Sequence, residues 1–409
     1  MHVVVVGGGV IGLTTAYHLV QQGAAVTVLD ARATGLGASA VNAGWFVPAE
    51  AMPVPGPKVV AMTLKWMLQP DSPVYIRPSL DPAFWSFMMR MWRKSNAADQ
   101  RAGFEAHLRL AQDTAHLLDE YRADGMDFEM HCAGLLMAFT DKANLAHHEH
   151  SLDLVRAHGL DPQVLIGDDV RSHEPRLSDQ VYGGIYFPQE RHLDPRALVT
   201  ALHRRLVELG VEIIEDGAVD HVETTTDAVT AVRTPSARYA AEAVVLATGA
   251  WTGPASRLFG RSLPVRPGKG YSIDLPALEL RSATNLSDAK VAVTPFSDRL
   301  RLSGTMEFAG LDERVNQVRV DAILRAPSTY FRDWLPPAAE LTPRAGIRPM
   351  TPDGLPVIGR LPGLRNAYVS SGHGMLGVTL AAGSARALTG LVLRGTADPV
   401  LAPFDPARF

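Results

Sequence analysis

The stretch VVVVGGGVIGLTTAYHLVQQGAAVTVLD, residues 3–30, decides the fold. It begins with the β-branched run Val3–Val6, which is typical of a parallel strand buried on both faces. A helical pattern then runs to Gln22, Gly23 ends it, and a second buried strand is expected over Ala25–Leu29. Strand, turn, helix and strand form one βαβ unit, so the stretch predicts a parallel sheet.

Three glycines of this unit stand in the spacing G-x-G-x-x-G. Gly7 allows a tight turn, Gly9 lets the backbone approach a pyrophosphate, and Gly12 lets the helix pack closely on the strand. The free amides at the start of the helix would bind the anion, and Asp30 would accept hydrogen bonds from ribose hydroxyls. The residues expected to border the nucleotide here are Gly7, Gly9, Val10, Ile11, Gly12, Asp30, Ala31 and Arg32. The unit predicts a dinucleotide site but does not choose between FAD and NAD.

Composition narrows the class of protein. With 409 residues, 46% of them hydrophobic and 20% charged, the chain is large enough for two globular domains. The net charge of −4 gives no field that would attract nucleic acid. The one cysteine, Cys132, cannot form an internal disulfide and is expected to lie in the core, so we expect a cytoplasmic protein. The apolar run 3–20 is broken by glycines and favours a strand and helix over a membrane span, and no signal peptide is expected.

Further along the chain, several segments have recognisable patterns. GLGASAVNAGWF (35–46) is expected to be a loop that lies against a cofactor, and AFWSFMMRMWRK (83–94) and residues 103–123 are expected to be helices. Asp194 and Pro195 would open another helix, and residues 211–239 would form an antiparallel meander. AVVLATGAW (243–251) reads as a buried strand, residues 265–302 as further strands, and the segment from 371 as a glycine-rich turn and a final helix.

Five stretches, in order from end to end, resemble the D-amino acid oxidase and dehydrogenase superfamily of FAD enzymes. The nearest branch is that of the bacterial D-amino acid dehydrogenases, which includes D-hydroxyproline dehydrogenases. The stretches are GGGVIG (7–12) with Asp30, GASAVNAG (37–44), VVLATGAW (244–251), PVRPGKGYSI (264–273), and GIRPMTPDGLPVIG (346–359) followed by SGHGMLGVTLAAGS (371–384). The combination is far more specific than any one motif.

The resemblance implies an α/β fold in two interleaved domains. A discontinuous Rossmann-type domain over 1–50, 195–262 and 345–409 would bind FAD non-covalently. Residues 51–194 and 263–344 would form an α+β substrate domain with an antiparallel sheet. By motif, the further FAD contacts would be Ser39, Asn42, Ala43, Gly44, Ala247, Thr248, Gly249, Gly372, Gly374, Met375, Leu376 and Gly377. The last of these would lie at the isoalloxazine, where helix amides stabilise negative charge.

The resemblance also implies a reaction and three residues that serve it. Arg348 would grip the substrate carboxylate bidentately. His373 would contact the flavin or the substrate, or be a satisfied supporting histidine, and Tyr271 would face the substrate or pack in the sheet. A D-amino acid would lose a hydride to the flavin and be hydrolysed to a 2-oxo acid and ammonia. Electrons would pass to a quinone or another acceptor.

Two alternatives stay open at this point. One is an oxidase of glycine, sarcosine or a cyclic secondary amino acid such as proline or hydroxyproline, which passes electrons to O2. The stretch GHGML lacks the second arginine of the glycine oxidase branch, and a tyrosine expected near TPFSDRL is missing. The other alternative is a flavin-bearing electron-transfer or scaffold subunit of a complex.

Two features lie outside the motifs. The run from His147 to His150 favours a solvated helix surface over a metal site, because adjacent helical residues point apart. Residues 58–94 mix tryptophan and methionine with lysine and arginine, which suits either a pair of helices that caps the substrate domain or peripheral contact with the inner face of the cell membrane.

Overall fold

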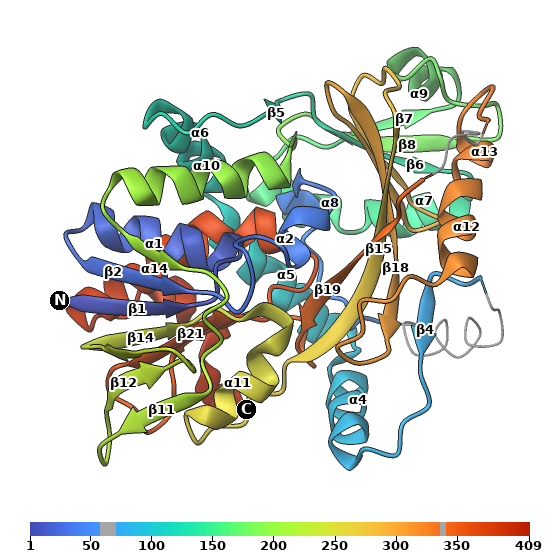
Figure 1. Ribbon diagram of the computed structural model, residues 1–409. Helices are drawn as coiled ribbons and strands as arrows, with labels where there is room; N and C mark the ends of the chain where they lie inside the picture. The colour runs from blue at the N-terminus through green and yellow to red at the C-terminus, as the bar shows by residue number, and fades with distance from the viewer. Residues whose placement is uncertain (58–70, 336–340) are drawn as a thin grey trace.

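The computed structural model describes residues 1–57, 71–335 and 341–409. Figure 1 shows two halves, each built on a sheet, with the N-terminal strands in one half and the long strands β15 (Arg266–Pro276) and β18 (Arg299–Phe308) in the other. Helices and sheets are mixed in both halves. The α/β class predicted from the sequence is therefore confirmed.

The first sheet is mostly parallel and collects strands from the beginning, middle and end of the chain. In spatial order its strands are β10 (Glu212–Ile214), β2 (Ala25–Leu29), β1 (His2–Val6), β14 (Ala243–Leu246), β21 (Ala367–Ser371) and β20 (Val357–Arg360). β1 pairs in parallel with both β2 and β14, so its β-branched residues are buried on both faces. The βαβ unit predicted from residues 3–30 is confirmed.

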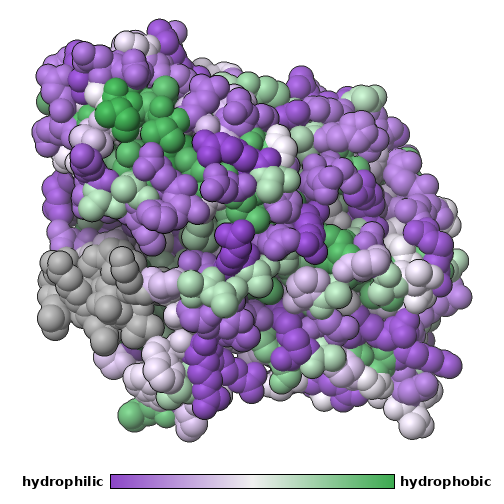
Figure 2. All heavy atoms as spheres, turned by 180° about the vertical axis from the view of Figure 1, so that it is seen from behind, coloured by the Kyte–Doolittle hydropathy of each residue, from purple (hydrophilic) through white to green (hydrophobic). Residues whose placement is uncertain are grey.

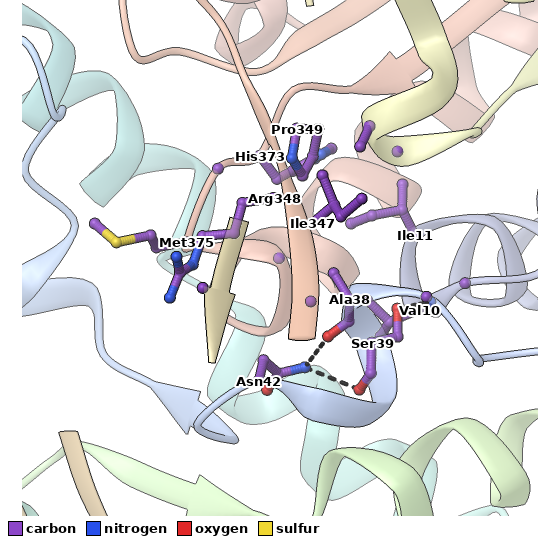
Figure 3. A pocket seen from close by; sticks show the side chains of 18 of the residues that line it. Val10, Ile11, Ala38, Ser39, Asn42, Ile347, Arg348, Pro349, His373 and Met375 are labelled. Carbon is purple, nitrogen blue, oxygen red and sulfur yellow. Dashed lines mark hydrogen bonds between the residues drawn. The ribbon is translucent and has the colours of Figure 1, made fainter. Parts of the chain in front are cut away.

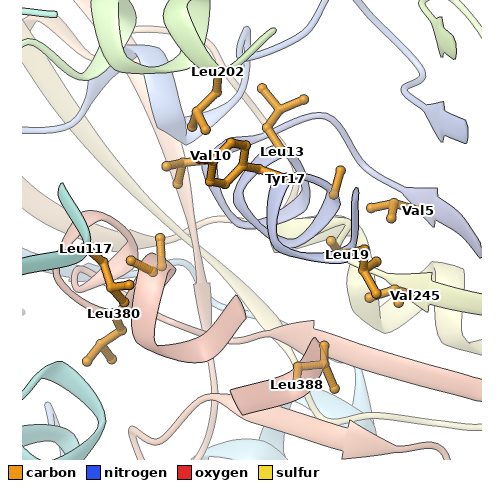
Figure 4. Close-up of a cluster of buried hydrophobic side chains, with 14 of the residues drawn as sticks. Val5, Val10, Leu13, Tyr17, Leu19, Leu117, Leu202, Val245, Leu380 and Leu388 are labelled. Carbon is orange, nitrogen blue, oxygen red and sulfur yellow. The ribbon is translucent and has the colours of Figure 1, made fainter. Parts of the chain in front are cut away.

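Three long helices cover this sheet: α1 (Val10–Gln21), α10 (Pro195–Glu208) and α14 (Gly377–Arg394). Asp194 caps α10 by accepting from the amides of Arg196 and Ala197, as the sequence predicts. Figure 4 shows one core that joins these elements. Its labelled side chains are Val5, Val10, Leu13, Tyr17, Leu19, Leu117, Leu202, Val245, Leu380 and Leu388.

The helix predicted over 103–123 is wrong in extent, because two helices occupy this region. They are α5 (Ala97–Ala111) and α6 (Thr114–Ala123), and the chain turns at Asp113, which pairs with Arg386 of α14. Leu117 and Leu118 belong to the same core as α14. The predicted domain division assigns these two helices to the substrate domain. They instead pack on α14, because their apolar side chains contact those of α14.

The second sheet is mostly antiparallel. Its strands in spatial order are β19 (Arg344–Met350), β15, β18, β17 (Val291–Pro295), β16 (Ala283–Leu286), β6 (Leu135–Phe139), β8 (Gly183–Phe187) and β7 (Gln163–Ile166), and β4 (Val74–Ile76) also pairs with β18. β19 pairs with β15 and so belongs to this sheet, although the predicted division at residue 345 places it with the FAD-binding segments. Its residues pair with β15 in antiparallel register, from Arg344 opposite Ser272 to Met350 opposite Arg266.

Two smaller sheets complete the strands. The meander predicted over 211–239 is present as β11 (His221–Thr224), β12 (Val229–Arg233) and β13 (Arg238–Ala240), whereas β10 from the same segment joins the parallel sheet. The other small sheet contains β3 (Trp45–Phe46), β9 (Arg191–Leu193) and β5 (Met130–His131). Cys132 lies in the loop after β5 and is exposed, so its predicted core position is wrong. The apolar residues of β6 take that place in the core instead.

The remaining helices surround the second sheet or connect the segments. They are α2 (Ala38–Val41), α4 (Pro82–Lys94), α7 (Lys142–Glu149), α8 (Leu152–Ala157), α9 (Asp168–His173), α11 (Thr252–Leu258), α12 (Gln317–Arg325) and α13 (Pro327–Tyr330). Short 3-10 turns are η1 (Pro48–Glu50), η2 (Gly249–Trp251), η3 (Pro399–Phe404) and η4 (Pro406–Arg408). Within the described ranges, none of the helices combines the length and the apolar character that a membrane crossing requires.

The rear surface is mostly hydrophilic and carries a hydrophobic patch at its upper left (Figure 2). This is the side on which β7 forms the edge of the second sheet. The exposed apolar side chains of β7 are Val164 and Ile166.

A buried arginine ties the second sheet to the loop that follows α2. Arg301 of β18 is 1% exposed, and its Nε and Nη2 donate to the Asp274 carboxylate over 2.7 and 3.1 Å. Its Nη1 donates to the main-chain oxygen of Asn42 over 3.0 Å. All three contacts hold the guanidinium in one orientation and fix the position of the Asn42 loop against the sheet.

We expect Arg301→Met to lower the free energy of unfolding by about 1–3 kcal/mol, because it removes the most buried partner of the Asp274 carboxylate, which Arg299 and Arg344 continue to pair. Arg325→Met is the matched control, since Arg325 pairs with Asp71 on the surface, and it should cost less than about 1 kcal/mol. Urea unfolding followed by tryptophan fluorescence measures both. Equal effects of the two substitutions would contradict the structural role of the buried pair.

Candidate active site

A cavity of about 1030 Å³ lies between the two sheets and collects most of the predicted site residues. The predicted residues that line it are Gly7, Gly9, Val10, Ile11, Asp30, Ala31, Arg32, Ser39, Asn42, Ala43, Gly44, Ala247, Thr248, Gly249, Tyr271, Arg348, His373, Gly374, Met375, Leu376 and Gly377. Gly12 lies behind the wall, and Gly372 borders a small adjoining pocket. Segments far apart in the sequence thus meet around one space.

The glycine turn at the start of α1 depends on close main-chain contacts. Gly7 has φ +115°, and a Cβ on it would lie 2.4 Å from the Ala247 carbonyl oxygen. A Cβ on Gly12 would lie 1.8 Å from the carbonyl oxygen of Gly7. Gly9 is the N-cap and provides no side-chain cap, so the first turn of α1 is free to bind an anion at the cavity.

Asp30 stands at the end of β2, where its carboxylate has two main-chain donors. It accepts from the amides of Gly8 and Arg32 over 2.6 and 2.8 Å, and burial raises its pKa. The Arg32 guanidinium is held by Glu313 at 3.0 Å and lies over the Trp251 ring. Because Arg32 already has these partners, this end of the cavity suits ribose hydroxyls better than a ribose phosphate.

The loop after α2 forms another wall. Asn42 donates from Nδ2 to the carbonyl oxygens of Ala38 and Ser39, over 3.2 and 2.9 Å (Figure 3). Its Oδ1 accepts from the Gly44 amide over 2.7 Å. Ser39 Oγ in turn accepts from the amide of Val10 over 2.9 Å, which joins this loop to the first turn of α1.

The first turn of α14 lies on the same cavity as that of α1. Leu376 is its N-cap and provides no side-chain cap. Thr379 fixes the turn, because its Oγ1 donates to the Trp45 carbonyl oxygen and accepts from the Val47 amide, over 3.2 and 3.1 Å. Two helix N-termini therefore direct partial positive charge into one cavity.

Arg348 carries a positive charge into the cavity without an acidic partner. Its Nη1 donates to the Thr305 carbonyl oxygen over 2.7 Å, and no ion pair with it is formed within the described part of the chain. A Cβ on Gly270 would lie 2.2 Å from Nη1, so the glycine provides the room that the guanidinium occupies. Burial lowers the pKa of Arg348 to about 10, and the side chain therefore remains a cation at neutral pH.

Comparisons with known proteins agree with this geometry. The family model described as FAD dependent oxidoreductase, DAO, matches residues 2–391. The chain belongs to the DAO family of FAD-dependent oxidoreductases. It is 33% identical to D-amino acid dehydrogenase 1 of Mesorhizobium japonicum, with 96% of each chain covered, and 31% identical to D-amino acid dehydrogenase of Vibrio atlanticus, with 97% of each covered.

Solved structures show the same DAO fold. Glycine oxidase from Geobacillus kaustophilus superposes with a TM-score of 0.79 at 24% identity, covering 100% of this chain and 98% of that one. L-proline dehydrogenase from P. horikoshii superposes with a TM-score of 0.75 at 18% identity, covering 100% and 97%. The predicted family and its cofactor, FAD, are thus confirmed. The cavity also fits FAD, since it offers two uncapped helix N-termini and a carboxylate at the end of β2.

The other two predicted catalytic residues, His373 and Tyr271, both border the cavity, and the buried Nδ1 of His373 has no hydrogen-bond partner among the described residues. His373 is 3% exposed, its Nε2 lies 3.1 Å from Ser384 Oγ, and burial lowers its pKa to about 3, so it is neutral. The Tyr271 ring packs in the core of the second sheet, and its hydroxyl donates to Glu307 over 2.6 Å. Tyr271 thus packs in the sheet and also borders the cavity, so its contact with the substrate stays a prediction.

Sequence reasoning missed several polar residues of the cavity, among them Glu50, Asn285, Lys290 and Thr305. A signal for Glu50 is present, because it is the one charged residue in the stretch 33–57 of the sequence. Thr305 has φ +69°, a conformation that no sequence motif marks. Asn285 lies on β16, and Lys290 ends the turn between β16 and β17 with φ +57°, so only the fold brings them to the cavity.

We expect Gly12→Ala to destabilise the protein by about 1–3 kcal/mol, because its Cβ would collide with the Gly7 carbonyl and displace α1. The same displacement should remove most of the bound FAD. Gly390→Ala is the control, since Gly390 lies in α14 outside the cavity lining and the nearest atom to its Cβ would be the flexible end of the Arg394 side chain, at 2.8 Å. The ratio of flavin to protein absorbance and the melting temperature report both effects, and full FAD content in Gly12→Ala would refute the assigned turn.

Proposed function

We propose that the protein is an FAD-dependent dehydrogenase that converts D-amino acids to 2-oxo acids and ammonia. The observation that carries the proposal is Arg348, a half-buried cation at the cavity that bonds only a main-chain oxygen and the Met306 sulfur within the described residues and has no acidic partner there. Such a group favours a ligand with a carboxylate. The names of relatives with 31–33% identity over nearly the whole chain support the same substrate class.

FAD would be held without a covalent bond. The Asp30 carboxylate would bind the adenosine ribose, and the first turn of α1 with Ser39 would bind the pyrophosphate. The residues that open α14, Gly374–Gly377, would lie at the pyrimidine edge of the flavin, where the helix dipole favours negative charge. Cys132 supports non-covalent binding, because the one thiol of the chain does not line the cavity.

When bound, FAD supplies a two-electron acceptor for the hydride that leaves Cα. Arg348 would fork onto the substrate carboxylate and fix the direction of the Cα–H bond. As the hydride leaves, the lone pair of the neutral amine forms the C=N bond of an iminium ion. Water then adds to this carbon and the nitrogen leaves as ammonium, which gives the 2-oxo acid. No side-chain base is required, and the neutral His373 is consistent with a supporting role.

The test is anaerobic mixing of the holoenzyme with pairs of D- and L-amino acids. The flavin absorbance should bleach with D-amino acids and not with their L-enantiomers. Arg348→Met should raise KM about 100-fold or more, because it removes a charged, bidentate contact, and should leave the FAD content unchanged. Arg325→Met, a surface substitution, is the control for both readouts.

The same experiment separates the rivals. A flavin that no amino acid bleaches would refute the dehydrogenase and favour an electron-transfer subunit. For the electron acceptor we propose a quinone, so turnover under air should produce little peroxide and a soluble quinone analogue should accelerate it. Stoichiometric peroxide would identify an O2-using oxidase instead.

We further propose that α4 contacts a membrane surface, where a quinone acceptor would reside. Trp85, Met89 and Trp92 are exposed and follow the spacing i, i+4, i+7 on one face of the helix. The exposed Arg90 and Arg93 suit anionic headgroups. Of the segment 58–94 predicted to make this contact, residues 58–70, with Lys58, Lys65, Trp66 and Met67, lie outside the described residues.

Flotation with anionic liposomes tests this contact. The wild-type protein should float with the vesicles, and the double substitution Trp85→Ser and Trp92→Ser should reduce the floating fraction several-fold, because it removes the exposed aromatic area. The control is Val164→Ser with Ile166→Ser, which removes exposed apolar side chains from β7 instead. Wild-type protein that stays entirely at the bottom of the gradient would refute the proposal.

A further inference from the structure

Glu50 and Lys290 face the cavity with polar atoms that no other described group satisfies. Glu50 Oε2 accepts from Asn285 Nδ2 over 2.7 Å, whereas its Oε1 is buried and has no hydrogen-bond partner among the described residues. Lys290 lines the same cavity and forms no hydrogen bond or ion pair within the described ranges. The two side chains interact electrostatically and form no hydrogen bond with each other, and Lys290 also interacts with Asp288.

This pair lies close to Arg348 across the floor of the cavity. The register of β17 and β18 pairs Val291, which follows Lys290, with Gly304. The next residue, Thr305, provides the carbonyl oxygen that Arg348 binds. Neighbouring strands are about 4.8 Å apart, so Lys290 begins roughly one strand spacing from that carbonyl. One strand spacing is comparable to the distance between the carboxylate and the end of the side chain in a single amino acid.

Asn285 holds Glu50 on the side of the cavity where Lys290 lies. It lies on β16, opposite Ala292 of β17, and both residues line the cavity. Its hydrogen bond draws the Glu50 carboxylate from η1 toward the strands that carry Lys290. Asn285 is therefore a positioning residue, and it leaves the second carboxyl oxygen of Glu50 for a ligand.

The buried Oε1 of Glu50 is costly without a ligand, whereas Lys290 is exposed at the cavity and is available to one. Burial raises the pKa of Glu50 to about 7. A polar group kept from water and without a hydrogen bond costs free energy, and a ligand that supplies the bond recovers it. An aliphatic side chain could satisfy neither Lys290, which only donates, nor Glu50, which accepts when ionised.

We propose that Glu50 and Lys290 form the subsite for the substrate side chain, and that this subsite selects side chains that both donate and accept a hydrogen bond. Hydroxyl and carboxamide groups meet this requirement: the oxygen accepts from Lys290 Nζ while O–H or N–H donates to Glu50. Aliphatic side chains of the same size are disfavoured. The inference rests on the proposed function, since it takes Arg348 as the carboxylate clamp.

The test compares two substrates of nearly equal shape, D-asparagine and D-leucine. The wild-type holoenzyme should prefer D-asparagine in kcat/KM by about 10–100-fold, the value of one or two hydrogen bonds to charged groups. Lys290→Met and Glu50→Met should each reduce that ratio about ten-fold or more, mainly by raising KM for D-asparagine. Glu50→Gln keeps the shape and the polar atoms and should retain part of the preference.

A second measurement needs no turnover. Succinamate and 4-methylpentanoate are the same two ligands without the amino group, and their binding is followed through the flavin absorbance. Succinamate should bind more tightly to the wild-type holoenzyme, and Lys290→Met should remove the difference without changing the Kd of 4-methylpentanoate. Binding of these ligands requires only the carboxylate clamp, so this measurement tests the subsite independently of the reaction. Selective binding of succinamate by a protein whose flavin no amino acid bleaches would refute the proposed function and retain the subsite.

Three outcomes would overturn the subsite. One is a wild-type enzyme that prefers D-leucine and 4-methylpentanoate. Another is an asparagine-to-leucine ratio that stays unchanged in Lys290→Met and Glu50→Met. The last is a Lys290→Met variant in which the FAD content or the flavin spectrum changes while the Kd values of the two ligands change equally. Lys290 would then interact with the flavin and not with the substrate side chain.

Discussion

The position of the whole site depends on the approach of α1 to the glycine turn. Because Gly12 has no side chain, the helix rests directly on the carbonyl of Gly7, where a Cβ would come within 1.8 Å of that oxygen. α14 packs on α1 through a shared core, seen in Figure 4 around Leu13 and Leu380. One main-chain contact therefore sets the place of both helices, and with them the place of the two N-termini that meet at the cavity.

The charges of the molecule fall into two groups with different physical roles. Arg301 and Asp274 satisfy each other through two hydrogen bonds, so their burial fixes the Asn42 loop against the second sheet. Arg348, Glu50 and Lys290 lack such partners and all line the cavity. Keeping polar groups away from water is unfavourable unless they are paired. The unpaired set therefore marks where a ligand completes the structure, and the paired set marks where the scaffold is already complete.

Local patterns in the sequence predicted the structural features that depend on residues close together in the chain. The βαβ unit, the cap of α10 at Asp194 and the glycine-rich turn before α14 follow from spacing within about twenty residues, so they could be recognised. The surroundings of Tyr271 could not, because the register of β15 against β18 shifts between Lys269 and Tyr271, and no local pattern marks this irregularity. The predicted core position of Cys132 was wrong because the buried strand β6 begins only at Leu135, three residues later.

The pairing of Glu50 with Lys290 is a further property that only the fold creates. The two residues are far apart in the sequence and meet because β16 and β17 reach the cavity beside η1. This arrangement also bears on the hand of the substrate. If Arg348 fixes the carboxylate and the subsite fixes the side chain, the two remaining substituents on Cα are hydrogen and the amino group. Inverting the centre exchanges them, so one enantiomer presents its Cα–H bond to the flavin and the other presents nitrogen. Selection between enantiomers therefore requires that the substrate carboxylate and side chain are both held in place relative to the plane of the flavin. In the proposed assignment, Arg348 holds the carboxylate, and Glu50 with Lys290 holds the side chain.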